Sequence, residues 1–182
     1  HFVRRRQRQM CIRDSIKPGI IHLGLGNFHR AHQALYLDDL FNMGLDHDWG
    51  IVGSGVMPHD AAMRKALFEQ DLLTTVVELE PGANKVRVIG SMVDFLPVES
   101  GNPSLIRALC DPKIRIVSMT ITEGGYFIDP ATGKFNPNFP QMIDDSKNLE
   151  SPKTVFGILV QALKLRRQGL NQNPKNLSLI HI

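Results

Sequence analysis

The stretch from Ile21 to His32, which reads IHLGLGNFHRAH, carries the residues whose types and spacing indicate ligand chemistry. Gly24 and Gly26 follow a short apolar run and precede a segment with helical spacing of apolar residues. Glycines at such a turn let the backbone bend tightly and let a diphosphate approach the amides at a helix amino terminus. Arg30, in the first helical turn, would add a charge-assisted contact to the phosphates. We therefore consider this turn a candidate dinucleotide cradle.

The glycine pattern is incomplete, because His29 stands where the third glycine of G-x-G-x-x-G is expected. From the residues alone, a dinucleotide cradle and a plain tight turn between strand and helix both remain open. His29 and His32 also have the spacing of two metal ligands on one helix face. No cysteine, carboxylate or third histidine lies at a spacing that would complete such a site, so we predict no metal.

A dinucleotide site needs an acid after the second strand to bind the adenosine ribose hydroxyls. Asp60 follows the apolar run 51–56 closely enough for this role. The alternative role is N-cap of the next helix, and one carboxylate can serve both. If Asp60 binds the ribose, it repels the 2′-phosphate of NADP, so NAD is the expected cofactor and NADP the less favoured one.

The third candidate group is Thr122 and Glu123, at the carboxyl end of the apolar run 114–121. Ligands of open α/β sheets bind at this edge, so both residues are expected near the nicotinamide end of the cofactor. The alternative is a polar loop that opens with the glycine pair Gly124 and Gly125. Because Glu123 has no identifiable acid or base partner in this chain, we assign no catalytic residue.

The elements that must position these residues alternate between apolar runs and helical spacing, which predicts an α/β, Rossmann-like doubly wound and mostly parallel sheet. Pro58 to Asp60 should start a helix that buries Met63, Leu67 and Phe68. A β-hairpin should interrupt the alternation, and 126–149 should be an irregular excursion. The predicted strands are 20–23, 49–56, 73–79, 86–92 and 114–121, and the predicted helices are 28–41 ended by Gly44, 60–68, 104–110, and one from Ser151-Pro152 to Gln168 capped by Gly169.

Charge and composition exclude several classes of protein. Five of the first fifteen residues are arginines, whereas 16–170 is mildly acidic, so no basic surface for nucleic acid is expected. No apolar run approaches about 18 residues, so we expect no membrane span. The two cysteines, Cys11 and Cys110, lack C-x-x-C spacing, which fits a reducing, cytoplasmic compartment.

Both ends of the chain look foreign to the domain. The segments MCIRDS and LSLIHI resemble translated sequencing-adaptor read-through. We therefore interpret 1–15 as a non-native basic tail, 16–170 as an incomplete nucleotide-binding domain, and 171–182 as a second non-native tail outside the fold. A transit peptide is the alternative for the arginine-rich start, although no apolar core or cleavage site follows it.

Five stretches give the sequence a family likeness: GLGNFHRAHQALY, DWGIVGSG, VRVIGS, IRIVSMTITEGGY and SPKTVFG, which start at residues 24, 48, 86, 114 and 151. In them the chain resembles the mannitol dehydrogenase family of long-chain polyol dehydrogenases, which includes fructuronate and tagaturonate reductases. The resemblance implies a truncated Rossmann domain in which His29 is the family's own variation. It also implies a set of cofactor-binding residues, namely Gly24, Leu25, Gly26, Asn27, Phe28, His29, Arg30, Asp60, Thr122 and Glu123.

The same resemblance implies hydride transfer between NAD and a polyol or ketose, with mannitol and fructose as the expected pair. Members of the family use a lysine base, helped by asparagine and histidine, in a helical C-terminal domain without zinc. No stretch here matches that domain, so we expect this polypeptide to be inactive by itself. The alternatives are a sugar-acid reductase of the fructuronate or tagaturonate type and a non-catalytic NAD-binding module.

Overall fold

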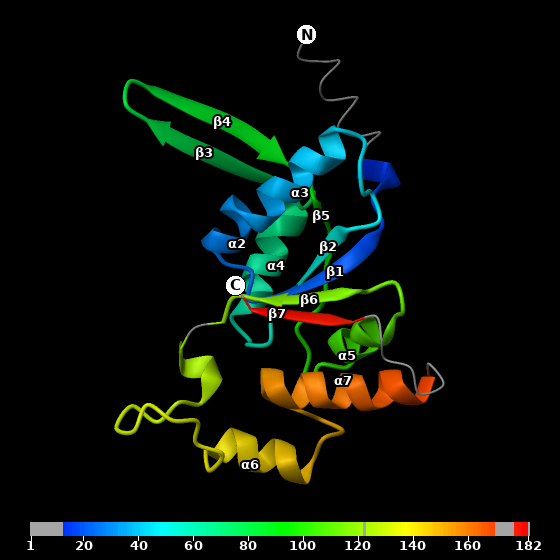
Figure 1. The fold of residues 1–182 in the computed structure, drawn as a ribbon, viewed down its shortest axis with the longest axis vertical. Coiled ribbons are helices and arrows are strands. Elements are labelled where there is room, and N and C mark those ends of the chain that lie inside the picture. The colour runs from blue at the N-terminus through cyan, green and yellow to red at the C-terminus, as the bar shows by residue number, and fades with distance from the viewer. Residues whose placement is uncertain (1–12, 122, 170–176, 182) are drawn as a thin grey trace.

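The computed structural model describes residues 13–121, 123–169 and 177–181 (Figure 1). Strands and helices alternate along most of the chain, as the apolar pattern predicts. In order they are β1 (Pro18–Leu23), α2 (Asn27–Ala31), α3 (Gln33–Asn42), β2 (Gly50–Ser54), α4 (Asp60–Glu69), β3 (Thr74–Glu80), β4 (Ala83–Ile89), β5 (Met92–Phe95), α5 (Pro103–Cys110), β6 (Ile116–Met119), the 3-10 helix η1 (Glu123–Tyr126), α6 (Pro140–Lys147), α7 (Val155–Gly169) and β7 (Ser178–His181).

The main sheet has the strand order β5-β2-β1-β6-β7, and every pairing in it is parallel. The chain builds outward from β1 to β2 and β5, and then returns to the other side of β1 to form β6. This reversal confirms the predicted doubly wound fold. It also creates a topological switch point between β1 and β6, where open α/β sheets bind their ligands.

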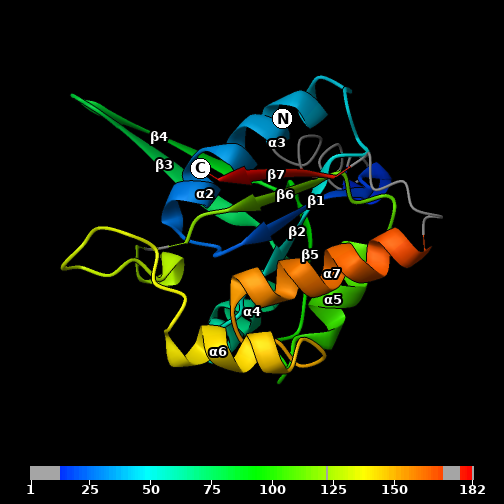
Figure 2. The ribbon, with the colours of Figure 1, turned by 60° about the horizontal axis from the view of Figure 1, so that its bottom comes forward.

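Helices cover both faces of this sheet (Figure 2). One face packs on α5 and α7, and its core includes Leu23, Val117, Leu109 and Ile158. The other face packs on α3, α4 and the base of the hairpin, and its core includes Ile51, Ala34, Leu67 and Phe95. β1 is buried from its second residue onward because both of its faces are covered, which explains its continuous apolar run. Within the described residues, no helix is long and apolar enough to cross a membrane.

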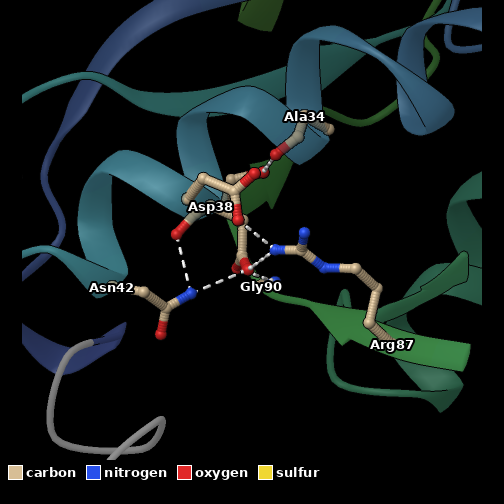
Figure 3. A network of polar contacts seen from close by, with 7 residues as sticks. Ala34, Asp38, Asn42, Arg87 and Gly90 are labelled. Atoms are coloured by element: carbon tan, nitrogen blue, oxygen red, sulfur yellow. Dashed lines mark hydrogen bonds and ion pairs between the residues drawn. The ribbon is translucent and has the colours of Figure 1, made fainter. Parts of the chain in front are cut away.

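β3 and β4 form the predicted hairpin, which projects from the body as a separate two-stranded sheet (Figure 1). The predicted strand 86–92 is divided, because β4 ends at Ile89 and β5 of the main sheet begins at Met92. A buried carboxylate, Asp38 of α3, anchors the base of the hairpin (Figure 3). Asp38 accepts hydrogen bonds from the Gly90 amide at 2.8 Å and the Asn42 side chain at 2.9 Å, and Arg87 of β4 pairs with it at 3.4 Å. Burial raises the pKa of Asp38. The hairpin therefore has a defined position against α3.

The helix predicted over 28–41 is divided into α2 and α3 at His32, whose φ of −122° and ψ of −82° are not helical. This break changes the face that α2 presents to the sheet. His29 is buried, whereas the side chain of Phe28 is 55% exposed. Phe68 of α4 is also exposed, against prediction. Gly44 ends α3 as predicted, with a φ of +78°.

Two further elements differ from the sequence-based prediction. The excursion after Tyr126 contains the helix α6, and α7 begins at Val155 rather than at Pro152. Thr154 is the effective cap of α7, because its hydroxyl accepts a hydrogen bond from the Gly157 amide at 3.0 Å. Asp145 of α6 binds both the amide and the hydroxyl of Thr154. The cap depends on a residue from another helix, so local sequence did not reveal it.

The ordered body does not end at Gly169 as predicted, because β7 adds a fifth strand to the sheet. Its residues pair with β6 from Ile116 opposite Ser178 to Met119 opposite His181. Leu177 packs against the core on the α5 and α7 side. The physical reason is that β6 would otherwise present unpaired backbone groups along one edge, which a short apolar segment can satisfy.

Candidate functional site

The candidate site lies where β1, β2 and β6 end side by side. The Gly24 amide donates a hydrogen bond to the Ser54 carbonyl at 3.2 Å, and the Thr120 amide donates one to the Leu23 carbonyl at 3.0 Å. The Thr120 hydroxyl also donates a hydrogen bond to the Gly24 carbonyl. These bonds tie the predicted glycine turn to the switch point between β1 and β6.

The two glycines of the turn differ in how much space surrounds them. Gly24 has a φ of +83°, and a Cβ atom there would lie 2.4 Å from the Thr120 carbonyl oxygen. A side chain at Gly24 is therefore excluded by both conformation and space. Gly26 is the N-cap of α2, and a Cβ atom there would meet only the Gly24 carbonyl oxygen, at 3.9 Å. The space beside Gly26 is open, so a ligand can approach its backbone.

The position of the missing third glycine is filled by a ring stack. His29 lies on His22 of β1, with ring centroids 3.6 Å apart and planes inclined by 19°. Both residues are buried, with exposures of 1% and 0%. The third glycine normally allows close packing of helix on strand. Here two stacked imidazoles occupy that space, which explains how the turn forms with histidine at this position.

Sequence reasoning missed His22, which is the centre of a buried polar network. His22 Nδ1 lies 2.8 Å from the Ser118 hydroxyl, and His22 Nε2 lies 3.0 Å from the Thr120 hydroxyl. The Ser118 hydroxyl also lies 3.1 Å from Gln33 Oε1 of α3. A histidine in an apolar strand, with a serine in another apolar run, was the available signal, but the register that pairs them is a tertiary property.

Burial lowers the pKa of both stacked histidines. The pKa of His22 falls to about 4, chiefly by desolvation and against the raising effect of the Gly24 backbone. The pKa of His29 falls to about 2, chiefly by desolvation and further because His22 and Arg30 lie close to it. Both imidazoles are therefore neutral at pH 7. Among the described residues, neither ring nitrogen of His29 has a hydrogen-bond partner.

Arg30 is placed between the glycine turn and α4. One guanidinium nitrogen donates a hydrogen bond to the Asn27 side-chain oxygen, and the other lies 3.7 Å from the sulfur of Met63. Met63 follows Asp60 by about one helical turn. The guanidinium is thus within the same corner of the fold as the predicted ribose acid.

Asp60 follows β2 directly, as predicted, but it is the first residue of α4 and not its N-cap. Its Oδ2 accepts a hydrogen bond from the Met57 amide at 2.9 Å and so closes the turn before the helix. A Cβ atom at Gly55 would lie 2.0 Å from the Asp60 Cβ, so only glycine lets the carboxylate occupy this place. Oδ1 lies 3.6 Å from Nε2 of the exposed His59 and takes no part in closing the turn.

The third predicted group is not placed in the same detail. Thr122 lies outside the described residues, and Glu123 begins η1, which leaves the carboxyl end of β6. For His29 and His32, the alternative metal pair, the described residues contain no group of three or more histidine, cysteine or acidic side chains that could hold a metal.

The sequence that carries the glycine turn and Asp60 matches a known domain. Residues 18–178 match the family described as the mannitol dehydrogenase Rossmann domain. The chain belongs to the mannitol dehydrogenase family. The predicted resemblance is thereby confirmed, and the five stretches that carried it fall on elements around the sheet.

Individual members of this family give the degree of similarity. The chain is 55% identical over 157 residues to a mannitol 2-dehydrogenase of Cereibacter sphaeroides, which covers 86% of this chain and 33% of the relative. It is 45% identical to a polyol:NADP oxidoreductase of Gluconobacter oxydans over 161 residues, 86% of this chain and 32% of the relative. The chain thus spans about a third of the length of these mannitol dehydrogenase relatives.

A solved member of the family has the same fold. The mannitol 2-dehydrogenase of Pseudomonas fluorescens, in a ternary complex with NAD and D-mannitol, superimposes with a TM-score of 0.83 at 42% sequence identity. The match covers 93% of this chain and 34% of that protein. The likeness extends over nearly the whole chain.

Proposed function

We propose that this chain is the NAD-binding part of an oxidoreductase that transfers a hydride between NAD and a polyol or its ketose, with mannitol and fructose as the substrate pair. The observation that carries the proposal is the Gly24 turn at the switch point, with the open approach to Gly26 beside it. The NAD and D-mannitol complex of the Pseudomonas fluorescens relative supports this assignment.

The residues present fit the cofactor. Gly24 and Gly26 would admit the diphosphate, Arg30 would neutralise part of its charge, and Oδ1 of Asp60 would bind the adenosine ribose. Leu25, Asn27, Phe28 and His29 complete the segment that we propose to hold NAD, and Thr122 and Glu123 would line its nicotinamide end. When bound, the nicotinamide supplies the hydride chemistry.

The chain's own contribution is to bind and orient. Thr120 holds the Gly24 carbonyl, Asp60 closes the turn at Met57, and the His22 and His29 stack supports α2. We propose that the lysine base and its asparagine and histidine helpers belong to a second domain outside these 182 residues. The 182-residue polypeptide is therefore expected to form no NADH from mannitol, and measurable turnover would contradict this part of the proposal.

The proposed cellular location is the cytoplasm. Cys110 supports it, because among the described residues it is a free, half-buried thiol. Its thiol lies against the Ala162 carbonyl at 3.6 Å, and burial raises its pKa. A protonated, half-buried thiol of this kind is typical of proteins from reducing compartments.

NAD binding can be tested with two glycine variants of similar backbone conformation. Gly24→Ala should abolish NAD binding in a calorimetric titration, because the new Cβ meets Thr120. Gly44→Ala is the matched control: Gly44 has a φ of +78°, and nothing lies within 4 Å of the place that a Cβ atom would take there. It should lose some stability and keep its affinity. Equal affinity of the two variants, or no NAD binding by the unaltered chain, would contradict the proposal.

A further inference from the structure

We infer that His22 is a positioning residue for the dinucleotide turn. Its Nε2 carries the ring proton and donates a hydrogen bond to the Thr120 hydroxyl, and this hydroxyl donates one to the carbonyl of Gly24. The role in cofactor binding rests on the proposed function, whereas the protonation pattern follows from the hydrogen bonds alone.

The protonation pattern starts at Gly24, because a carbonyl oxygen can only accept. The Thr120 hydroxyl lies within hydrogen-bond distance of this oxygen and must donate its proton to it. The same hydroxyl lies 3.0 Å from His22 Nε2 and has no second proton to give. His22 Nε2 must therefore carry the hydrogen of that contact.

The other ring nitrogen then acts as an acceptor, because burial lowers the pKa of His22 to about 4 and the ring is neutral. The Ser118 hydroxyl, 2.8 Å from Nδ1, donates to it. The Ser118 hydroxyl has one proton, so the Gln33 amide must turn its NH2 group toward this hydroxyl, in place of the Oε1 that lies 3.1 Å from it. A single direction of donation therefore runs from Gln33 through Ser118, His22 and Thr120 to Gly24.

The last of these hydrogen bonds, from Thr120 to Gly24, sets the orientation of the next peptide group. In a trans peptide the carbonyl of one residue and the amide N–H of the next point to opposite sides. Holding the Gly24 carbonyl toward Thr120 directs the Leu25 N–H away from β6. The Gly24 carbonyl also accepts the Gly26 amide at 2.8 Å. Both glycines of the turn are thus oriented through one carbonyl oxygen.

His29 contributes by covering the His22 ring. Its stacking distance of 3.6 Å leaves no room for water on that ring face. The groups that face the pair are Ser118 and Thr120 of β6, Gln33 of α3 and the charge of Arg30. Because His22 is itself fully buried, the hydroxyls of Ser118 and Thr120, which lie within hydrogen-bond distance of its two ring nitrogens, determine its tautomer.

The first test reads the tautomer of His22 directly by long-range 1H–15N NMR of the 15N-labelled 182-residue chain without ligand. We expect a protonated Nε2 and an unprotonated Nδ1 at pH 7. In Thr120→Val the acceptor for Nε2 is lost, so the proton should move to Nδ1 and toward Ser118. A protonated Nδ1 in the unaltered chain would overturn the inference. This measurement does not depend on whether any variant folds.

The second test measures NAD affinity in the same proteins. Thr120→Val should weaken NAD binding by about tenfold, the usual effect of one lost hydrogen bond. Thr120→Ser keeps the hydroxyl and should restore both affinity and tautomer, which a purely space-filling role of Thr120 would not predict. Unchanged affinity in Thr120→Val would refute the positioning role.

The two tests separate this inference from the proposed function. If the unaltered chain shows the Nε2–H tautomer and binds no NAD, the proposed function fails, and the role of His22 in NAD binding fails with it, although the hydrogen-bond directions stand. If the chain binds NAD with His22 in the other tautomer, the proposed function stands and the inference about His22 is wrong.

Discussion

The imidazole of His29 lies flat on that of His22, with 3.6 Å between the ring centroids, and both rings are buried and neutral. Their folded-state pKa values, about 2 and about 4, lie below the ordinary value of 6.5. Below pH 6.5 the unfolded chain therefore binds protons that the folded chain does not. The contribution of these two neutral histidines to the free energy of unfolding is fully present above pH 6.5, and it decreases as the pH falls toward 4.

This stack predicts a specific acid sensitivity. Each histidine should lower the free energy of unfolding by up to about 1.4 kcal/mol for each unit of decrease in pH. Urea unfolding between pH 6.5 and 5 measures this slope. His29→Phe keeps an aromatic ring on His22 and removes one titrating group, so the slope should fall by about half. Gly44→Ala, which removes no titrating group, is the control and should leave the slope unchanged. Equal slopes in all three chains would contradict the assignment.

Asp60 should determine the choice between NAD and NADP. Asp60→Asn keeps an oxygen that accepts the Met57 amide, so the turn should survive, but the negative charge is lost. We expect weaker NAD binding and stronger NADP binding, with a change of the affinity ratio of at least about tenfold. Calorimetric titration with both cofactors measures it. Asp46→Asn, which removes the same charge at an exposed position after α3, is the control, and an unchanged ratio in Asp60→Asn would exclude the ribose role.

Gly157 should tolerate no side chain, because α6 and α7 meet there. A Cβ atom would lie 2.1 Å from the Asp145 carboxylate oxygen that binds Thr154. Gly157→Ala should lower the free energy of unfolding by about 2–4 kcal/mol, although alanine is the better helix former. Gly169→Ala, in the same helix with open space around it, should be neutral or slightly stabilising. Urea unfolding of both variants would decide, and a neutral Gly157→Ala would show that the cap is not rigid.

Arg166 should stabilise the connection between α5 and β6. It is 1% exposed and donates hydrogen bonds to the carbonyls of Leu109, Asp111 and Ile114 at 2.8–2.9 Å. Arg166→Met leaves these three carbonyls without that donor and should cost about 3 kcal/mol in thermal or urea unfolding. Arg167→Met, at the exposed neighbouring position, should change stability by less than about 0.5 kcal/mol. Similar losses in both variants would argue against the role of Arg166.

Local signals predicted those features that depend on neighbours in sequence. Gly24 and Gly44 have the positive φ that their places in turns require, and β3 and β4 pair as the hairpin that their apolar runs predicted. The doubly wound fold also followed from the alternation of strand and helix patterns. These signals are reliable because each acts within one element or one turn.

The errors of the sequence-based predictions have a common origin in tertiary contacts. Helical spacing alone cannot show that the chain breaks at His32 and exposes Phe28. Nor can it show that Asp145 of α6 would cap α7 through Thr154 and so shift its start beyond Pro152. β7 was excluded from the fold because its residues looked foreign, whereas the open edge of β6 accepts a strand on backbone hydrogen bonds that are indifferent to side-chain origin.

The sequence by itself determined the glycine turn, the acid at Asp60 and the family to which the domain belongs. Only the tertiary structure decided what supports that turn. His22 lies 96 residues from Ser118 and 98 from Thr120 in the chain, and the register of β1 on β6 brings them together. Register depends on how two buried faces pack, and no single segment encodes it. The hydrogen bonds that orient Gly24 therefore became visible only in the folded chain.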